Sequence, residues 1–282
     1  MRLSIRHTTR YEFSQPLAHG LQRLRLRPKT THGQDVIEWE TDLDGAVREL
    51  EYDDQHHNHV ELISVEAGVK ALSITSTGIV DTSDNAGIIG QHAGHMPLWC
   101  FLRQTKLTRP GPRMRAMVQG LGTDRSNSLD LLHELSRLIA EQVAYEKGMT
   151  DVGTLAETAL EKGHGVCQDH SHIFIGAGRL LDIPMRYIGG YLKMEGQAEQ
   201  EAGHGWAEAH VEGLGWVGFD VSNQISPDDR YVRVATGCDY SEAAPVTGIA
   251  FGEHDSALEV RLTVEQELKG QQQQQQQQTN GR

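Results

Sequence analysis

The chain is poor in cysteine, in positive charge and in long apolar runs. Its 282 residues include only three widely spaced cysteines, Cys100, Cys167 and Cys238, which suggest neither a disulfide framework nor a CxxC metal pair. The net charge of −13 argues against nucleic-acid and membrane partners, because both attract basic surfaces. No stretch reaches the roughly 18 apolar residues of a membrane-spanning helix. The N-terminus lacks the apolar block of a signal peptide, so we expect a cytoplasmic protein.

Segments of alternating polarity fill the first 85 residues. The run that begins at Leu3, the run Val60–Val65 and the segment that carries Leu72 predict short β-strands. We expect the last two to pair, and Asp44-Gly45 to form a hairpin turn. Short strands joined by polar turns favour a β-sandwich. We therefore assign residues 1–85 to an N-terminal β domain.

Apolar residues at helical spacing follow in the middle of the chain. The pattern predicts a helix over residues 131–143, with Ser126 or Ser128 as its cap. The segment from Thr154 to Glu157 has the form of a capping box for a second helix.

A third helix is expected from Cys167 to Leu181, followed by strands near residues 185–192, 205–211, 216–221 and 257–264. We assign residues 95–268, including these last strands, to a second domain. Residues 269–282 contain the polyglutamine run Gln271–Gln278 and no apolar side chain that could be buried. We expect this tail to be disordered.

Cys167 stands in the segment GHGVCQDH, residues 163–170, where the predicted third helix begins. Unpaired backbone N–H groups at a helix N-terminus favour a thiolate and can stabilise an oxyanion. The alternative is a buried, unreactive cysteine, since free cysteine is among the most buried residue types.

Residues farther along the chain favour the interpretation of Cys167 as a nucleophile. One strand-like segment, HGWAEA, begins at His204, and the next, GWVGFD, ends at Asp220. Two adjacent antiparallel strands would place these side chains together, and a histidine between a carboxylate and a thiol is the arrangement of papain-like enzymes. His210 shares the strand face of His204, so spacing alone does not choose between the two histidines.

Several ordered blocks resemble the transglutaminase-like superfamily, in its bacterial branch with an N-terminal β domain. They are GVCQD at 165–169, IPMRYIGGY at 183–191, HGWAE at 204–208 and GWVGFD at 215–220, with weaker blocks at 5–11, 24–28, 239–240 and 244–248. The resemblance implies an α+β fold, with an N-terminal β-sandwich-like domain and a papain-like or transglutaminase-like catalytic domain over residues 95–268. In such a domain the helix that carries the cysteine packs on an antiparallel sheet. The resemblance also assigns the catalytic roles to Cys167, His204 and Asp220.

Two positions depart from the family's pattern. His170 stands where an aromatic residue is usual, and Cys238 stands where arginine is expected. Neither belongs to the implied triad.

Three further residues have two interpretations each. Asp169 either supports the site or is a first-turn carboxylate favoured by the helix dipole. Tyr145 is either a second oxyanion donor or a core residue. Trp206 either packs over the imidazole or is an ordinary core side chain.

No cofactor is indicated. His56, His57 and His59 lie near Asp53 and Asp54, but no second group of ligands is evident, so a hydrated turn is favoured over a metal site. Phosphate-binding motifs are absent from the sequence, and the resemblance implies neither an organic cofactor nor a metal.

Together these observations predict a cysteine enzyme that acts on amide or isopeptide bonds of a peptide or protein through a thioester. We expect hydrolysis, as in a peptidase or amidase, because the segment 193–203 is acidic and polar and would admit water. The alternatives are transfer to an amine, as in a transglutaminase, and a non-catalytic binding protein of the same fold.

Overall fold

Alternation of buried and exposed side chains builds the longest strands. β1 (Arg2–Phe13) and β6 (Ala71–Thr82) bury about every second residue, because successive side chains of a strand point to opposite faces. In the computed structural model, which describes residues 1–122, 127–251 and 256–267, they belong to a five-stranded sheet ordered β11-β16-β1-β6-β3. Its other strands are β3 (Gln34–Asp44), β11 (Glu199–Gln200) and β16 (Ser256–Gln266).

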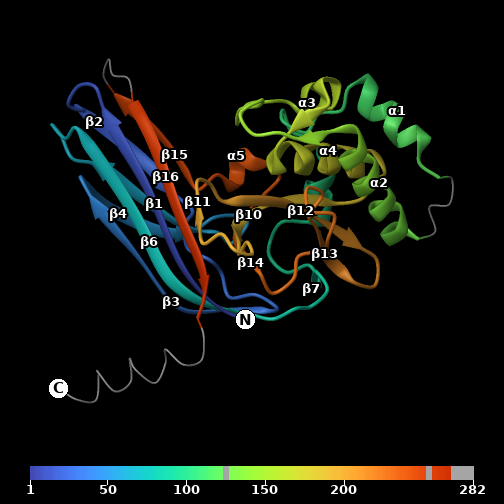
Figure 1. The fold of residues 1–282 in the computed structure, drawn as a ribbon, viewed down its shortest axis with the longest axis horizontal. Coiled ribbons are helices and arrows are strands. Elements are labelled where there is room, and N and C mark those ends of the chain that lie inside the picture. The colour runs from blue at the N-terminus through green and yellow to red at the C-terminus, as the bar shows by residue number, and fades with distance from the viewer. Residues whose placement is uncertain (123–126, 252–255, 268–282) are drawn as a thin grey trace.

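A second sheet faces the first and completes a sandwich (Figure 1). Its order is β15-β2-β5-β4, and its strands are β2 (His19–Leu24), β4 (Ala46–Asp53), β5 (His59–Val65) and β15 (Val246–Phe251). The shared core includes Phe13, Leu72 and Ile74 from the first sheet and Leu24, Ile63 and Val65 from the second. A fully buried side chain of this kind contributes about 1.5–3 kcal/mol. The alternating pattern is therefore also a main source of the sandwich's stability.

Two predicted strand pairings are wrong. Gly45, with φ at 87°, does turn the chain, but β3 pairs with β6 while β4 pairs with β5 in the facing sheet. The turn thus leads from one sheet to the other and closes no hairpin. β5 likewise pairs with β2 and β4, not with the strand that carries Leu72. Alternation shows which face of a strand is buried, but it does not identify the neighbouring strand.

Strands from the C-terminal part of the chain complete both sheets of the sandwich. β16 pairs antiparallel with β1 from Leu3↔Gln266 to Phe13↔Ser256, and β15 pairs with β2. The sandwich is therefore assembled from segments that are distant in the sequence. The domain limits of 1–85 and 95–268 stay a prediction, and the polyglutamine tail lies outside the described residues.

The rest of the chain forms a third sheet covered by helices. The sheet has the order β14-β10-β12-β13-β7, with β7 (Ile88–Gly90), β10 (Met185–Leu192), β12 (His204–Val211), β13 (Gly215–Phe219) and β14 (Tyr231–Gly237). The longer helices are α1 (Pro112–Gly120), α2 (Ser128–Gln142), α3 (Ala156–Lys162) and α4 (Cys167–Leu180). The shorter elements are η1 (Leu98–Leu102), α5 (Tyr240–Ala243) and a parallel pair, β8 (Ala144–Tyr145) with β9 (His164–Gly165).

α4 is the central helix of this part. Every residue from 168 to 179 is buried, because α1, α2 and α3 pack around the helix and β12 lies beneath it (Figure 1). Ile173, Phe174 and Ala177 share a core with Ala207 and Ala209 of β12. The predicted α+β fold, with the cysteine's helix packed on an antiparallel sheet, is confirmed.

Two helix caps differ from the prediction. Asn127 caps α2, since its side chain accepts from the backbone N–H groups of Leu129 and Asp130. Thr154 does not cap α3 but donates its hydroxyl to Asp151. Glu157 accepts from three N–H groups at the start of α1. Glu157 lies in the first turn of α3, as the sequence predicts, but its carboxylate accepts from the N-terminus of α1.

The sandwich packs directly against the third sheet. Leu3, Ile5 and Leu262 share a core with Tyr191 and Val232.

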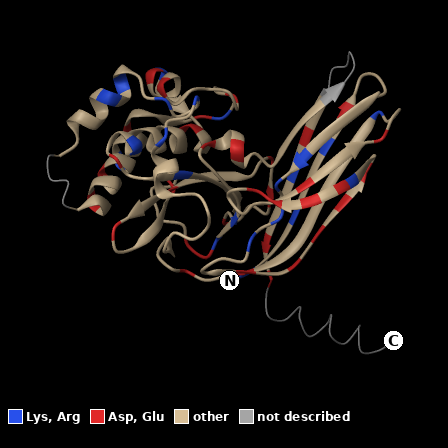
Figure 2. Cartoon of the chain, turned by 180° about the vertical axis from the view of Figure 1, so that it is seen from behind, with Lys and Arg blue, Asp and Glu red and all other residues tan. Residues whose placement is uncertain are grey.

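Along the sandwich, segments with Lys and Arg alternate with segments with Asp and Glu (Figure 2). Within the described residues, no helix combines the length and the apolar character that crossing a membrane requires.

Candidate active site

Cys167 is the first residue of α4. The backbone there is fixed by Asp169, whose Oδ2 accepts from the N–H of Val166 at 2.8 Å and from the hydroxyl of Thr150 at 2.7 Å. The first N–H groups of a helix have no partner within the helix and carry its positive dipole end. The thiol therefore lies where negative charge is stabilised.

His204 is the first residue of β12, and its ring contacts both other members of the candidate triad. Nε2 lies 2.6 Å from Oδ2 of Asp220, and the Cys167 side chain lies close enough to raise the pKa of the ring. Because Asp220 occupies Nε2, we assign Nδ1 to the thiol. The imidazole thus lies between the carboxylate and the sulfur, as the sequence predicts for His204.

Asp220 directly follows β13 and is held by several donors. Its Oδ2 accepts from Tyr231 Oη and from Asn223 Nδ2, each at 2.7 Å, besides His204. Burial acts to raise its pKa, but the hydrogen bond and charge of His204, aided by Tyr231 and Asn223, hold the pKa below its ordinary value. The group therefore stays a carboxylate and keeps the ring oriented.

The charge of His204 follows from its two partners. Burial acts to lower its pKa, but hydrogen bonds and negative charge from Asp220 and Cys167 outweigh burial and raise the pKa to about 10. The ring therefore keeps its proton at neutral pH and can donate it.

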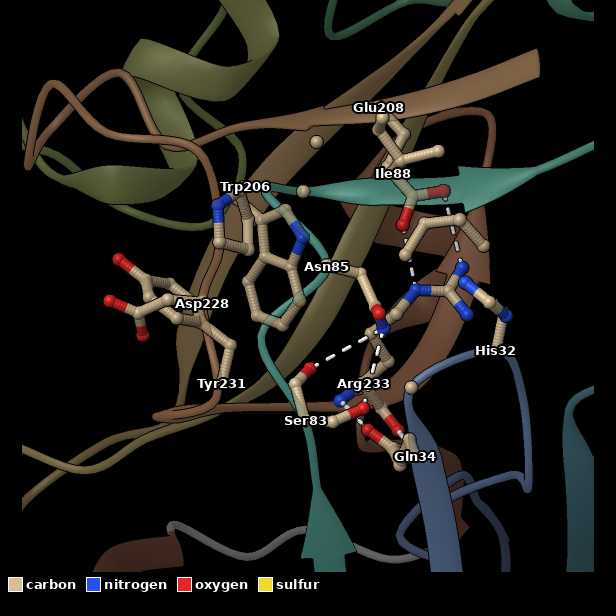
Figure 3. A pocket seen from close by; sticks show the side chains of 15 residues that line it. His32, Gln34, Ser83, Asn85, Ile88, Trp206, Glu208, Asp228, Tyr231 and Arg233 are labelled. Carbon is tan, nitrogen blue, oxygen red and sulfur yellow. Dashed lines mark hydrogen bonds and ion pairs between the residues drawn. The ribbon is translucent and has the colours of Figure 1, made fainter. Parts of the chain in front are cut away.

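Trp206 packs against the imidazole and is also a core side chain, 1% exposed, so both interpretations of the sequence apply. Its ring stacks on His204, with centroids 6.1 Å apart, and meets Tyr231 edge-on at 5.4 Å. Behind Trp206 and Tyr231 lies a small polar pocket that contains the buried ion pair of Glu208 with Arg233 (Figure 3). The indole thus separates the imidazole from this charged pair.

Tyr145 and Asp169 also lie at the site. Tyr145 is 48% exposed, so it is not a core residue, and it lines a groove together with Cys167. Burial, followed by the negative charges of Cys167 and Asp220, raises the pKa of Tyr145 to about 12, so the phenol can act as a donor. Asp169 is 1% exposed and fixes the turn before Cys167. These contacts agree with a first-turn carboxylate, and a supporting role of Asp169 in catalysis stays a prediction.

His210 lies elsewhere on the sheet. Its ring meets Trp216 edge-on at 5.4 Å, and burial, His92 and Arg186 lower its pKa. Spacing alone does not separate the two histidines, but the structure places His204, and not His210, beside Asp220 and the cysteine.

Sequence reasoning missed Tyr231 and Asn223. Asn223 is only three residues beyond Asp220 and donates to it in a local turn, so an asparagine close after the aspartate was an available signal. Tyr231 belongs to β14, and no local sequence pattern predicts its contact with Asp220.

Two cavities meet at Cys167 and His204. One, of about 330 Å³, has largely apolar walls that include Tyr187, Tyr240 and Val260. The other, of about 1220 Å³, is lined by Tyr145 and by the polar segment up to Gly203. Residues of β16 contribute to both cavities, so the sandwich forms part of the walls around the thiol.

The histidine-rich turn before β5 is not simply hydrated. His56 is 7% exposed, and its Nε2 lies 2.8 Å from Oε2 of Glu242, nearly 190 residues later in the chain. The favoured interpretation of a hydrated turn is therefore wrong for His56, because a distant segment covers it.

Comparisons with known proteins agree with this fold. Residues 3–81 match the bacterial transglutaminase-like N-terminal region, and residues 115–221, which contain Cys167, His204 and Asp220, match the transglutaminase-like superfamily. The uncharacterized protein ML0607 of Mycobacterium leprae (strain TN) is 25% identical over 281 residues, covering 93% of this chain and 98% of its own length. The uncharacterized protein Rv2569c of Mycobacterium tuberculosis (strain ATCC 25618 / H37Rv) is 24% identical over 291 residues, covering 93% and 92%.

A solved structure extends the match to the whole fold. It is the structure of a protein from Cytophaga hutchinsonii that is described as a candidate cysteine protease. It superposes with a TM-score of 0.75 at 21% identity, covering 95% of this chain and 92% of that one. That structure shows the same fold, and the two matched regions show that the chain belongs to the transglutaminase-like superfamily and carries the N-terminal region of its bacterial members.

Proposed function

We propose that the protein is a cysteine enzyme that cleaves amide or isopeptide bonds through a thioester. In this proposal Cys167 is the nucleophile, His204 the general base and acid, and Asp220 the residue that orients the imidazole. The observation that carries the proposal is the chain of contacts from the half-buried Cys167 through His204 to the buried Asp220. A structural role alone does not call for a thiol–imidazole pair at the meeting point of two cavities.

The reaction has two steps. The Cys167 thiolate attacks the amide carbonyl, and N–H groups at the start of α4 stabilise the oxyanion. The carbon–nitrogen bond breaks as His204 gives its proton to the leaving amine, which leaves a thioester on Cys167. Water then attacks the thioester while His204 removes its proton, and the acid is released with the thiolate–imidazolium pair restored. Tyr145 is a candidate second donor to the oxyanion.

The cavities support hydrolysis and suggest a substrate class. The cavity of about 1220 Å³ is broad, and its walls include the polar side chains of Glu199, Gln200 and Glu201, so water can reach a thioester there. The cavity of about 330 Å³ has tyrosine and valine in its walls, which suits an apolar or aromatic substrate side chain next to the scissile bond. We therefore favour a peptidase or amidase with that preference.

Amine transfer is the second candidate function. Glu199 and Glu201 line the larger cavity and would attract a cationic amine such as a lysine side chain. Such an amine must react faster than water at about 55 M, which requires a bound and oriented position.

A trapping and competition experiment tests both candidates. Wild type and Cys167→Ala are incubated with a peptide library, and mass spectrometry identifies the acyl group on Cys167. Selected peptides are then supplied with a millimolar primary amine. Mostly free acid supports hydrolysis, and mostly amine adduct supports transfer. A library that gives neither thioester nor product with the folded wild type would overturn the proposed function.

A further inference from the structure

Three metal-binding residue types meet where the sandwich joins α5. His56 comes from the turn between β4 and β5, Cys238 directly follows β14, and Glu242 lies in α5. One ligand atom from each lies within 4.8 Å of the other two. Two of the residues are almost fully buried, and Glu242 is partly exposed. We call His56, Cys238 and Glu242 the junction cluster.

The turn that carries His56 is held rigidly. Asp54 Oδ1 accepts from the backbone N–H groups of His56 and Asn58 at 2.9 and 3.0 Å, and Lys29 donates to the carbonyl of His56 at 2.9 Å. The imidazole itself bonds through Nε2 alone, since Nδ1 has no partner among the described residues. A metal on Nε2 would therefore replace one contact of the ring, the contact with Glu242.

The donor set and its spacing suit Zn²⁺. A thiolate, an imidazole and a carboxylate are its usual protein ligands, at about 2.0–2.3 Å from the ion, which places ligand atoms roughly 3.5 Å apart in a tetrahedron. In the junction cluster, Nε2 of His56 and Oε2 of Glu242 are 2.8 Å apart, and the wider spacing is at most 4.8 Å. Shifts of under about 1 Å bring all three onto one ion.

The charges of the ligands in the junction cluster also suit a divalent cation. A thiolate and a carboxylate together supply two negative charges to a divalent ion. Arg179 approaches Cys238 but donates to its carbonyl oxygen at 2.7 Å, so that hydrogen bond leaves the sulfur free. The partly exposed side of Glu242, at 33%, gives access from solvent and room for a water as fourth ligand.

We propose that His56, Cys238 and Glu242 bind one Zn²⁺ ion, with a water as fourth ligand, and that the ion fastens the sandwich to α5. Tyr240 and Ala243 of α5 also line the cavity of about 330 Å³ beside Cys167. An ion at the junction cluster would thus hold one wall of that cavity in place. Cys238 stands where the family resemblance predicts arginine, so the site is particular to chains with this substitution.

Cobalt binding tests the site without any enzymatic substrate. The full chain with Cys167→Ala, so that the active-site thiol cannot bind metal, is stripped with a chelator and titrated with Co²⁺. We expect one ion per chain and the charge-transfer absorption of a cobalt–thiolate bond. Cys238→Ser removes the band, whereas the matched control Cys100→Ser keeps it. In the same parent, Zn²⁺ at about 100 times its Kd raises Tm by roughly 5–10 °C, and His56→Asn removes this rise.

Two results would overturn the proposal. One is a folded parent protein, checked by circular dichroism, that binds no stoichiometric Co²⁺ and whose Tm does not respond to Zn²⁺. The other is a band that persists in folded Cys238→Ser. In either case the junction cluster is a hydrogen-bonded contact between two parts of the chain and holds no ion.

Discussion

The chain contains two groups composed of a cysteine, a histidine and a carboxylate, and they differ in which residue lies in the middle. In the candidate triad the imidazole of His204 bridges Cys167 and Asp220. In the junction cluster the carboxylate of Glu242 is central, since it accepts from His56 Nε2 and from the N–H of Cys238, each at 2.8 Å.

The order of these groups sets the state of each thiol. In the proposed function, Cys167 reacts as a thiolate beside the imidazolium of His204. Beside Glu242 the reverse holds, because burial and then the carboxylate's charge raise the pKa of Cys238 to about 12. The same three residue types thus give a nucleophile in one place and, without a cation, a protonated thiol in the other. The predictions below test this difference.

The largest effect is expected from the candidate triad itself. Cys167→Ala should lower kcat/KM on a trapped peptide by about 10⁴-fold or more, and His204→Ala by about 10³-fold or more. His210→Ala should cost less than about fivefold, because its ring contacts Trp216 and not the thiol. A folded His210→Ala variant more damaged than His204→Ala would show that the wrong histidine has been assigned as base.

Alkylation compares the two groups directly. In metal-free protein at pH 7, iodoacetamide should label Cys167 about 100-fold faster than Cys238, since only the thiolate reacts and Cys238 is 2% exposed. Peptide mapping by mass spectrometry measures both rates in one sample, with Cys100 as an internal reference. Equal rates for the two cysteines would contradict the difference in thiol state.

The ring of His204 should show its raised pKa in an NMR titration. Asp220→Asn removes a hydrogen bond and a negative charge that raise this pKa, while burial, which lowers it, remains. The midpoint should therefore move down from about 10 by about one unit or more. Asp81→Asn, which alters an ion pair with Arg2 in the sandwich, is the control and should leave the midpoint unchanged.

The same shift predicts how stability depends on pH. A folded-state pKa above the unfolded value of about 6.5 means that the imidazolium contribution is fully present below pH 6.5. It is lost as pH rises toward about 10, the folded-state pKa. The Tm advantage of wild type over Asp220→Asn should therefore shrink across this window. An advantage that grows with pH would contradict the assigned charge on His204.

The smallest effect is expected from the sandwich wall of the apolar cavity. Val260→Arg places a charge in the cavity of about 330 Å³ and should raise KM for an apolar peptide about 5- to 10-fold with little change in kcat. Ile249→Arg introduces the same charge at a 65% exposed position outside the cavity, and KM should stay within about twofold. Similar KM values for both variants would show that the sandwich does not contribute to substrate binding.

Local patterns predicted most of the second part of the chain. The helix predicted to begin at Cys167 does so, and the strands expected near 185–192 and 205–211 are β10 and β12. Helical and strand periodicities depend on neighbouring residues, so they can be recognised without tertiary information. The resemblance added the choice of His204 over His210, which spacing could not make.

Contacts between distant segments could not be predicted in this way. Strand neighbours in the sandwich, the donor from Tyr231 and the partner of His56 all depend on how elements pack in space. Alternation of apolar and polar residues shows which face of a strand is buried, but it does not show which strand lies next to it in the sheet. The junction cluster was missed for that reason, since His56 is 186 residues from Glu242 in the chain.

The pairing of β1 with β16 also has a consequence for biosynthesis. The partners Phe13 and Ser256 are about 240 residues apart, so at about 5–20 residues per second the ribosome needs roughly 10–50 s to deliver the second strand after the first. Until then one hydrogen-bonding edge of β1 is open, and open edges invite association between nascent chains. A product truncated before β16 would keep that edge and lack part of the wall around the thiol. The chain thus gains a complete cleft and loses its open edge in the same late step of folding.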